Sequence, residues 1–165
     1  MFKIPILILT YNRPKKFLKV LRSLKLVKPR KIYISCDGPK KFEDIIKIKN
    51  IRKNISNIKW KCSVYENFFE KNLGVKHSPE KGIDWFFKKE KFGIILEDDC
   101  IPSKTFYKFC ETLLTKYKNN ENIWAISGYN FKGKTNFGDG DYFISKYYLF
   151  SKIQGQYNQS IFKRK

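Results

Sequence analysis

Short apolar runs and amphipathic helical patterns alternate along this chain from its beginning. Residues 4–10 (IPILILT) form a continuous apolar run, which is typical of a strand covered on both faces in a parallel sheet. Pro14 then opens a pattern whose apolar positions share one helical face. The alternation predicts further strands at residues 31–36, 60–68, 92–96, 123–127 and 142–150, and helices at 42–54, from Ser78-Pro79 and from Ser103.

Alternating strands and helices imply crossover connections, because strands that run side by side in the same direction cannot be joined by a tight turn. The fold class we expect is therefore α/β, with a Rossmann-like, mostly parallel sheet flanked by helices. In such sheets ligands bind outside the carboxyl ends of the strands. We expect polar side chains to gather at that edge, namely Thr10, Tyr11, Asn12, Arg13, Asp37, Glu66, Asn67 and residues 97–99.

Length and composition indicate one domain with an apolar core, since the chain has 165 residues of which 42% are hydrophobic. The formal net charge of +20 suggests anionic partners such as phosphorylated molecules, nucleic acid or a membrane surface. Most of the cations are lysines spread over the whole chain, which favours a solvated surface with general anion affinity over a specific nucleic-acid face. The four cysteines lack CxxC spacing, so we expect buried thiols in a cytoplasmic protein, with at most peripheral contact at the inner membrane face.

Three adjacent acids, Glu97, Asp98 and Asp99, follow the most apolar of the predicted strands. Crowded carboxylates repel one another, so at least one of them requires a positive partner. Mg²⁺ or Mn²⁺ would meet this requirement, because such ions take one or two carboxylates and complete their shell with water and substrate phosphates. The alternative is that the acids favour the start of the helix after Ser103 through its dipole, which is worth about 0.3–1 kcal/mol.

Asp37 and Arg13 end or follow two other predicted strands at the same edge. Asp37 precedes Gly38-Pro39 and is either a turn residue or an acceptor for a base or ribose. Arg13 can bind a diphosphate or a base through its guanidinium fork, since a cation at a helix start gains nothing from the dipole. His77 is the single histidine, and without a GxSxG motif we expect it to be a partly exposed helix residue.

The segments PILILTYNRP, YISCDGP, ENFFEKNLG and GIILEDDC, in this order, resemble the nucleotide-binding half of a GT-A glycosyltransferase. The likeness is to bacterial nucleotide-diphospho-sugar transferases related to family 2 enzymes and to the N-acetylglucosaminyltransferase I family, and it covers residues 4–131. It implies a GT-A fold, a UDP- or GDP-sugar donor, Mn²⁺ or Mg²⁺, and transfer of the sugar to a hydroxyl of a glycan or another acceptor. In this likeness Thr10, Tyr11 and Arg13 border the nucleotide.

The same resemblance assigns the acids. Asp37 matches the residue that contacts the base or ribose, and residues 97–99 match a DxD-like motif. Asp99 would then be the direct metal ligand, while Glu97 and Asp98 face the ribose and the donor sugar.

The likeness fades after residue 131, which divides the chain into a nucleotide-sugar-binding part (1–131) and the start of an acceptor-side region (132–165) that we expect to be incomplete. Asp139 and Asp141 lie in a glycine-rich stretch there, and neither is assigned as the base that deprotonates an acceptor. Two other functions stay open. A sugar-nucleotide pyrophosphorylase would need a glycine-rich first loop, and a basic nucleic-acid-binding module would use lysines and surface aromatic residues.

Overall fold

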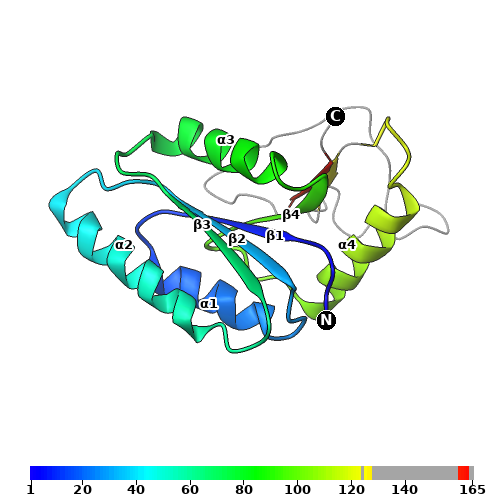
Figure 1. The fold of residues 1–165 in the computed structure, drawn as a ribbon, viewed down its shortest axis with the longest axis horizontal. Coiled ribbons are helices and arrows are strands. Elements are labelled where there is room, and N and C mark those ends of the chain that lie inside the picture. Colours follow the sequence, from blue (N-terminus) through cyan, green and yellow to red (C-terminus); the bar gives the residue numbers. More distant parts are fainter. Residues whose placement is uncertain (124, 128–159, 164–165) are drawn as a thin grey trace, which may run out of the picture.

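The computed structural model describes residues 1–123, 125–127 and 160–163, and it has the expected α/β architecture (Figure 1). Four parallel strands alternate with helices that cover the sheet. The strands are β1 (Ile6–Thr10), β2 (Lys31–Cys36), β3 (Ser63–Phe68) and β4 (Phe92–Glu97). The helices are α1 (Pro14–Leu24), α2 (Phe42–Asn54), the 3-10 helix η1 (Ile55–Asn57), α3 (Gly74–Phe87) and α4 (Lys104–Lys116).

The sheet order is β3-β2-β1-β4-β6-β5, so the parallel part is extended by two short strands, β5 (Ala125–Ser127) and β6 (Ser160–Lys163). β6 runs antiparallel to both β4 and β5. The sequence did not predict β6, because its few residues lie in a polar tail and its pairing partner β4 is far away in the chain. The strand expected at residues 142–150 lies outside the described residues.

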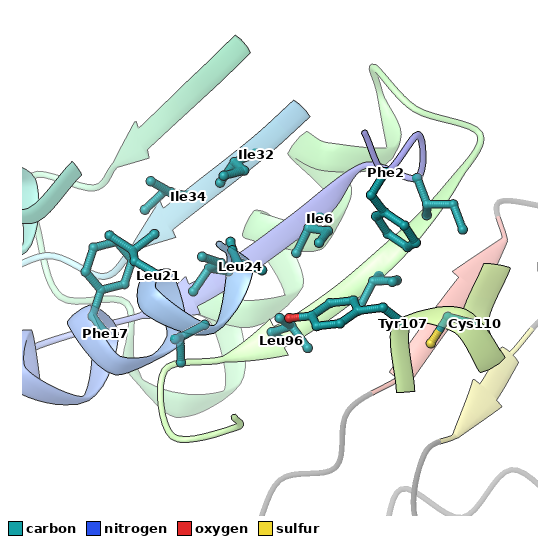
Figure 2. Packing of buried hydrophobic residues seen from close by; sticks show 14 of the residues in the cluster. Phe2, Ile6, Phe17, Leu21, Leu24, Ile32, Ile34, Leu96, Tyr107 and Cys110 are labelled. Carbon is teal, nitrogen blue, oxygen red and sulfur yellow. The ribbon is translucent and has the colours of Figure 1, made fainter. Parts of the chain in front are cut away.

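Helices lie on both faces of the sheet, and the alternation of side chains along β1 explains why (Figure 1). Ile6 and Ile8 face the larger core, which α1, α2 and α4 close from one side. Leu7 faces a smaller cluster under α3 on the opposite side. Figure 2 shows the larger core, with Phe17 of α1 and Tyr107 of α4 packed against the strands. Buried side chains on both faces account for the continuous apolar run in the sequence.

Local signals located most helix starts correctly. Pro14 is the first residue of α1, and the Ser103 hydroxyl caps α4 by accepting a hydrogen bond from Phe106 N–H at 3.2 Å. The predicted start of α3 at Ser78-Pro79 is wrong, because the helix begins at Gly74 and contains Pro79. Its first N–H groups are bound by a side chain from a distant loop, as described below, which no local pattern reveals.

The strand order reverses beside β1. Along the chain β2 and β3 are added on one side of β1, whereas β4 is added on the other. The carboxyl ends of β1 and β4 therefore lie at the topological switch point, which is where open α/β sheets bind ligands. Among the described helices, none is both long enough and apolar enough to cross a bilayer.

Candidate functional site

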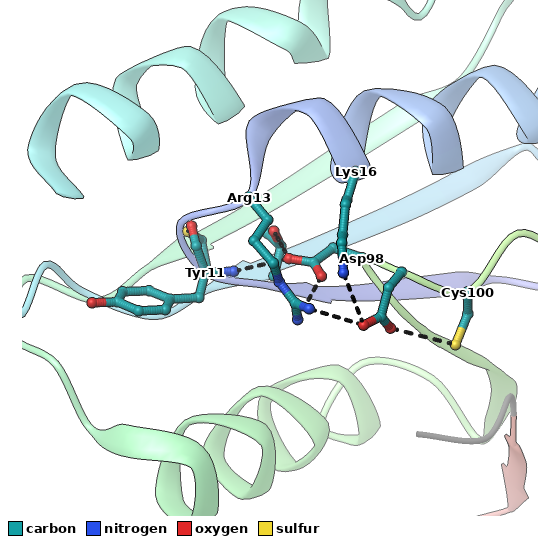
Figure 3. Close-up of polar contacts among 8 residues, drawn as sticks. Tyr11, Arg13, Lys16, Asp98 and Cys100 are labelled. Atoms are coloured by element: carbon teal, nitrogen blue, oxygen red, sulfur yellow. Dashed lines mark hydrogen bonds and ion pairs between the residues drawn. The ribbon is translucent and has the colours of Figure 1, made fainter. Parts of the chain in front are cut away.

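Arg13 connects the ends of β1 and β4 at the switch point (Figure 3). Its Nη2 lies 2.7 Å from Asp98 Oδ1, and its Nη1 donates a hydrogen bond of 2.8 Å to Asp99 Oδ2. The sequence predicted that Arg13 lies at this edge and that its guanidinium group binds a ligand. In the structure the guanidinium group binds two acids of the chain itself. One guanidinium thus neutralises two adjacent carboxylates.

Asp98 is the buried member of the acidic group, with 0% of its surface exposed. Thr10 Oγ1 donates a hydrogen bond of 2.8 Å to Asp98 Oδ2, and the Tyr11 N–H approaches the same oxygen at 3.4 Å. Within the described part of the chain no donor is aligned for a hydrogen bond to Oδ1, which Arg13 neutralises by charge. Burial raises the pKa of Asp98, while Thr10 and Arg13 act in the opposite direction. Asp98 therefore ties β4 to the loop after β1.

Asp99 is more accessible, and its two oxygens differ. Oδ2 binds Arg13 and also lies 3.6 Å from Lys16 Nζ. Within the described residues, the contact of Oδ1 is a long one of 3.9 Å from the Cys100 thiol. One oxygen of Asp99 thus remains able to bind another cation.

Glu97 faces the other side of the sheet from Asp98, because side chains alternate along β4 and Glu97 pairs in register with Leu9 of the α3 face. No residue in the described ranges donates a hydrogen bond to its carboxylate. Burial raises the pKa of Glu97 to about 8, with further contributions from Asp99 and then Asp98. This carboxyl is destabilised when it is charged, and a bound cation would relieve that cost.

Asp37 lies at the same edge, since its backbone N–H donates to the Thr10 carbonyl at 3.1 Å. Its carboxylate accepts hydrogen bonds from the segment in which α3 begins. Oδ1 accepts from the N–H groups of Gly38 and Leu73 at 2.8 Å each, and Oδ2 accepts from Asn72 Nδ2 at 3.0 Å and Gly74 N–H at 3.1 Å. Four donors use the carboxylate fully, which is why α3 begins at Gly74. The expected contact of Asp37 with a base or ribose stays a prediction.

Tyr11 points away from the Arg13 cluster in Figure 3 and binds the N-terminal turn of α2. Its hydroxyl donates to Asp44 Oδ2 at 2.6 Å, and Asn12 Nδ2 donates to Asp44 Oδ1 at 2.8 Å. These two hydrogen bonds, from Tyr11 first, hold the pKa of Asp44 well below its usual range. Burial and the bond to Asp44 raise the pKa of Tyr11 to about 12. The loop between β1 and α1 is therefore fixed by an acid at each side, Asp98 and Asp44.

Asp44 and Lys16 were not singled out from the sequence. Asp44 stands three residues after Lys41 and accepts its N–H at 2.9 Å, which is the spacing of a helix-start acid and could have been recognised. Lys16 stands three residues after Arg13, so both cations lie on one side of the first turn of α1. The partner that gives Lys16 a role, Asp99, is distant in the sequence.

Asp99 is the acid that the resemblance assigns to the metal ion, and that role stays a prediction. Among the described residues, no three His, Cys, Asp or Glu side chains are arranged to hold a metal ion. Asp98 turns to Thr10 and Arg13, which leaves Asp99 and Glu97 as the acids able to accept a divalent ion. This donor set fits Mg²⁺ or Mn²⁺, because such ions are commonly held by one or two carboxylates and otherwise by water and phosphate.

Histidine and cysteine chemistry has little support at this edge. His77 is exposed on α3, as expected, with its Nδ1 3.2 Å from Glu80 Oε2. Cys36, Cys100 and Cys110 are buried as predicted, whereas Cys62 is half-buried, and none of the four is in a disulfide. Burial raises the pKa of Cys36, so its thiol is protonated at neutral pH and is a poor nucleophile.

Taken together, the edge presents two cations, Arg13 and Lys16, beside two carboxylates with unused capacity, Asp99 and Glu97. The cations can bind anionic oxygens and the carboxylates can bind a metal ion that those oxygens share. No family model matches this sequence, and no curated protein matches it either.

Proposed function

We propose that the chain binds a nucleotide-diphospho-sugar together with Mn²⁺ or Mg²⁺ at the switch point between β1 and β4, and that it is a glycosyltransferase of the GT-A type. The observation that carries the proposal is the meeting of Arg13 and Lys16 with Asp99 at the carboxyl edge of the sheet. The ordered motifs that resemble this family include Arg13, which follows β1, and Asp99, which follows β4.

The charges at this edge suit a diphosphate better than a neutral ligand. Arg13 and Lys16 can supply donors for phosphate oxygens, and the Arg13 side chain is 41% exposed. The chain lacks a glycine-rich phosphate loop, so cations rather than backbone N–H groups have to neutralise the phosphates. The absence of such a loop also disfavours a pyrophosphorylase.

Asp99, with support from Glu97, is the residue assigned to hold the divalent ion. When bound, the ion stabilises the negative charge on the departing nucleoside diphosphate. Asp98 orients Arg13 and keeps the loop after β1 against β4. Burial raises the pKa of Glu97 to about 8, and a cation held beside it would favour the charged form of this carboxyl.

The test is a calorimetric titration of the full chain with UDP, GDP and their sugar conjugates, in the presence of Mn²⁺ or of EDTA. The proposal predicts that a nucleotide binds with Mn²⁺, that EDTA abolishes binding, and that Asp99→Asn abolishes it while circular dichroism shows an intact fold. Glu111→Gln, an exposed acid on α4 with the same change of charge, is the matched control and should bind as the wild type does.

Unchanged affinity in Asp99→Asn, or binding that is indifferent to EDTA, would refute the site assignment. A titration with single-stranded DNA separates the remaining alternative. Tight, strongly salt-dependent DNA binding without any metal-dependent nucleotide binding would identify a basic nucleic-acid-binding module instead.

A further inference from the structure

Helix α2 has two apolar faces, and the core uses only one of them. Ile51 is fully buried, and Ile48 and the following Ile55 pack against the larger core cluster. On the opposite side Phe42 is 80% exposed and Ile46 is 58% exposed. This arrangement explains the weak helical periodicity of the segment in the sequence, because apolar residues on opposite faces of a helix give it no single hydrophobic side.

The outer apolar residues form one continuous patch. Phe42, Ile45 and Ile46 stand at positions i, i+3 and i+4, which are neighbours on a helix surface, and Ile45 is 37% exposed. We call these three residues the α2 patch. Exposing a phenylalanine and two isoleucines side by side to water is unfavourable in free energy, so the patch indicates a site that binds a partner.

One more exposed apolar side chain lies close to the start of α2. Val75, in the first turn of α3, is 80% exposed. The loop before it contacts the loop before α2, since Asn72 Nδ2 donates to the Gly38 carbonyl at 2.9 Å. Figure 1 shows the N-terminal ends of α2 and α3 at the same side of the molecule.

Lysines surround these apolar residues. Lys49 and Lys53 continue the outer stripe of α2 at helical spacing, and both are exposed. Further exposed lysines flank the two first turns, namely Lys40, Lys41, Lys71 and Lys76. Glu43 and Glu70 are exposed beside them, so the surface is predominantly cationic rather than uniformly so.

We propose that the outer face of α2 docks on an anionic lipid surface, with Phe42 and Ile46 inserted at the headgroup boundary and the lysines on anionic headgroups. Apolar and aromatic side chains next to lysines are the pattern that binds such interfaces. A second copy of this chain is disfavoured, because each copy has a formal charge of +20. Single-stranded nucleic acid is disfavoured, because successive bases stack on aromatic rings and Phe42 is the one aromatic residue of the α2 patch.

Docking through α2 would bring the carboxyl edge of the sheet close to the lipid. Asp44, on the first turn of α2, binds both Tyr11 and Asn12 of the loop after β1. The orientation of the protein on the lipid surface follows from these contacts and from the α2 patch alone. The inference therefore goes beyond the proposed function and stands without it.

The test is co-sedimentation of the full chain with vesicles of phosphatidylglycerol and phosphatidylcholine, compared with vesicles of phosphatidylcholine alone. The wild type should bind the anionic vesicles. The double substitution Phe42→Ser, Ile46→Ser should weaken this binding about tenfold or more, because both side chains lose their burial in the interface. Leu26→Ser, a 57% exposed leucine just after α1, is the apolar control and should bind as the wild type does.

A second pair of variants tests the charges. Lys49→Glu, Lys53→Glu should weaken binding to anionic vesicles, whereas Lys59→Glu, Lys61→Glu, which change two other exposed lysines before β3, should have a smaller effect. Equal losses in both pairs would mean that net charge alone is responsible and would overturn the proposal. So would a wild type that does not bind vesicles, or a Phe42→Ser, Ile46→Ser variant that binds single-stranded DNA less well but vesicles unchanged.

Discussion

Replacing Arg13 with glutamine should destabilise the fold through the charge that it leaves on Asp98. Breaking a fully buried ion pair costs about 3–5 kcal/mol, and breaking an exposed one costs about 1 kcal/mol or less. Asp98 is fully buried while the Arg13 side chain is 41% exposed, so an intermediate loss of about 2 kcal/mol is expected. For a chain of this size that corresponds to a decrease in Tm of about 4–8 °C.

The loss should depend on pH in a defined direction. Without Arg13 the pKa of Asp98, already raised by burial, rises further, so the folded variant gains a proton that the unfolded chain lacks. The loss of stability in Arg13→Gln is then smallest in acid and grows as pH rises, because the buried Asp98 carboxyl must either keep its proton or carry an unpaired charge. Chemical denaturation at about pH 5 and about pH 8 measures the difference.

A double-mutant cycle with Asp98→Asn isolates the pair. We expect a coupling energy of about 2 kcal/mol at neutral pH. Arg22→Gln, an exposed arginine on α1, is the control and should change stability by less than about 0.5 kcal/mol. An Arg13→Gln variant as stable as this control, or one whose penalty is the same at both pH values, would refute the role given to Arg13.

Three further substitutions test other parts of the structure. Asp44→Asn should make the free energy of unfolding depend less on pH below about pH 4. The lowered pKa of Asp44 means that its carboxylate stabilises the fold above about pH 4 and that this contribution is lost in more acid solution. A variant with the same acid dependence as the wild type would contradict this. Glu97→Gln should raise Tm near pH 8 but not near pH 4. The raised pKa of Glu97 destabilises the folded wild type by about 1–3 kcal/mol, after solvent screening, as pH rises through that window. Melting curves of variant and wild type that coincide at both pH values would contradict this. Gly38→Ala should cost about 1–3 kcal/mol, because its new methyl carbon would collide with the backbone carbonyl group of Lys71, and an unchanged denaturation midpoint would contradict this.

The central sheet could be predicted because its signals are local. Continuous apolar runs mark the strands that are buried on both faces, and Pro14 and Ser103 mark helix starts through their own backbone and side-chain chemistry. The start of α3 could not be predicted in this way. Its first N–H groups are satisfied by Asp37, and that pairing exists only after β2 and the loop before α3 have come together.

The candidate site was predictable in position but not in its internal contacts. The rule that ligands bind at carboxyl ends of strands brought Arg13, Asp37 and the acids after β4 to one edge, and the structure confirms that placement. It could not assign partners, because the contacts differ between neighbouring acids. Asp98 binds Thr10 and Arg13, Asp99 binds Arg13, and Glu97 faces the other side of the sheet.

The most direct test of the proposed site is electron paramagnetic resonance of Mn²⁺ titrated with the protein in the presence of UDP or GDP. The signal of unbound Mn²⁺ should fall as wild-type protein is added and should fall much less with Asp99→Asn, whose folded state is verified by circular dichroism. Equal loss of the signal in both proteins, or no loss in the wild type with either nucleotide, would contradict the claim that Asp99 binds a divalent ion at the end of β4.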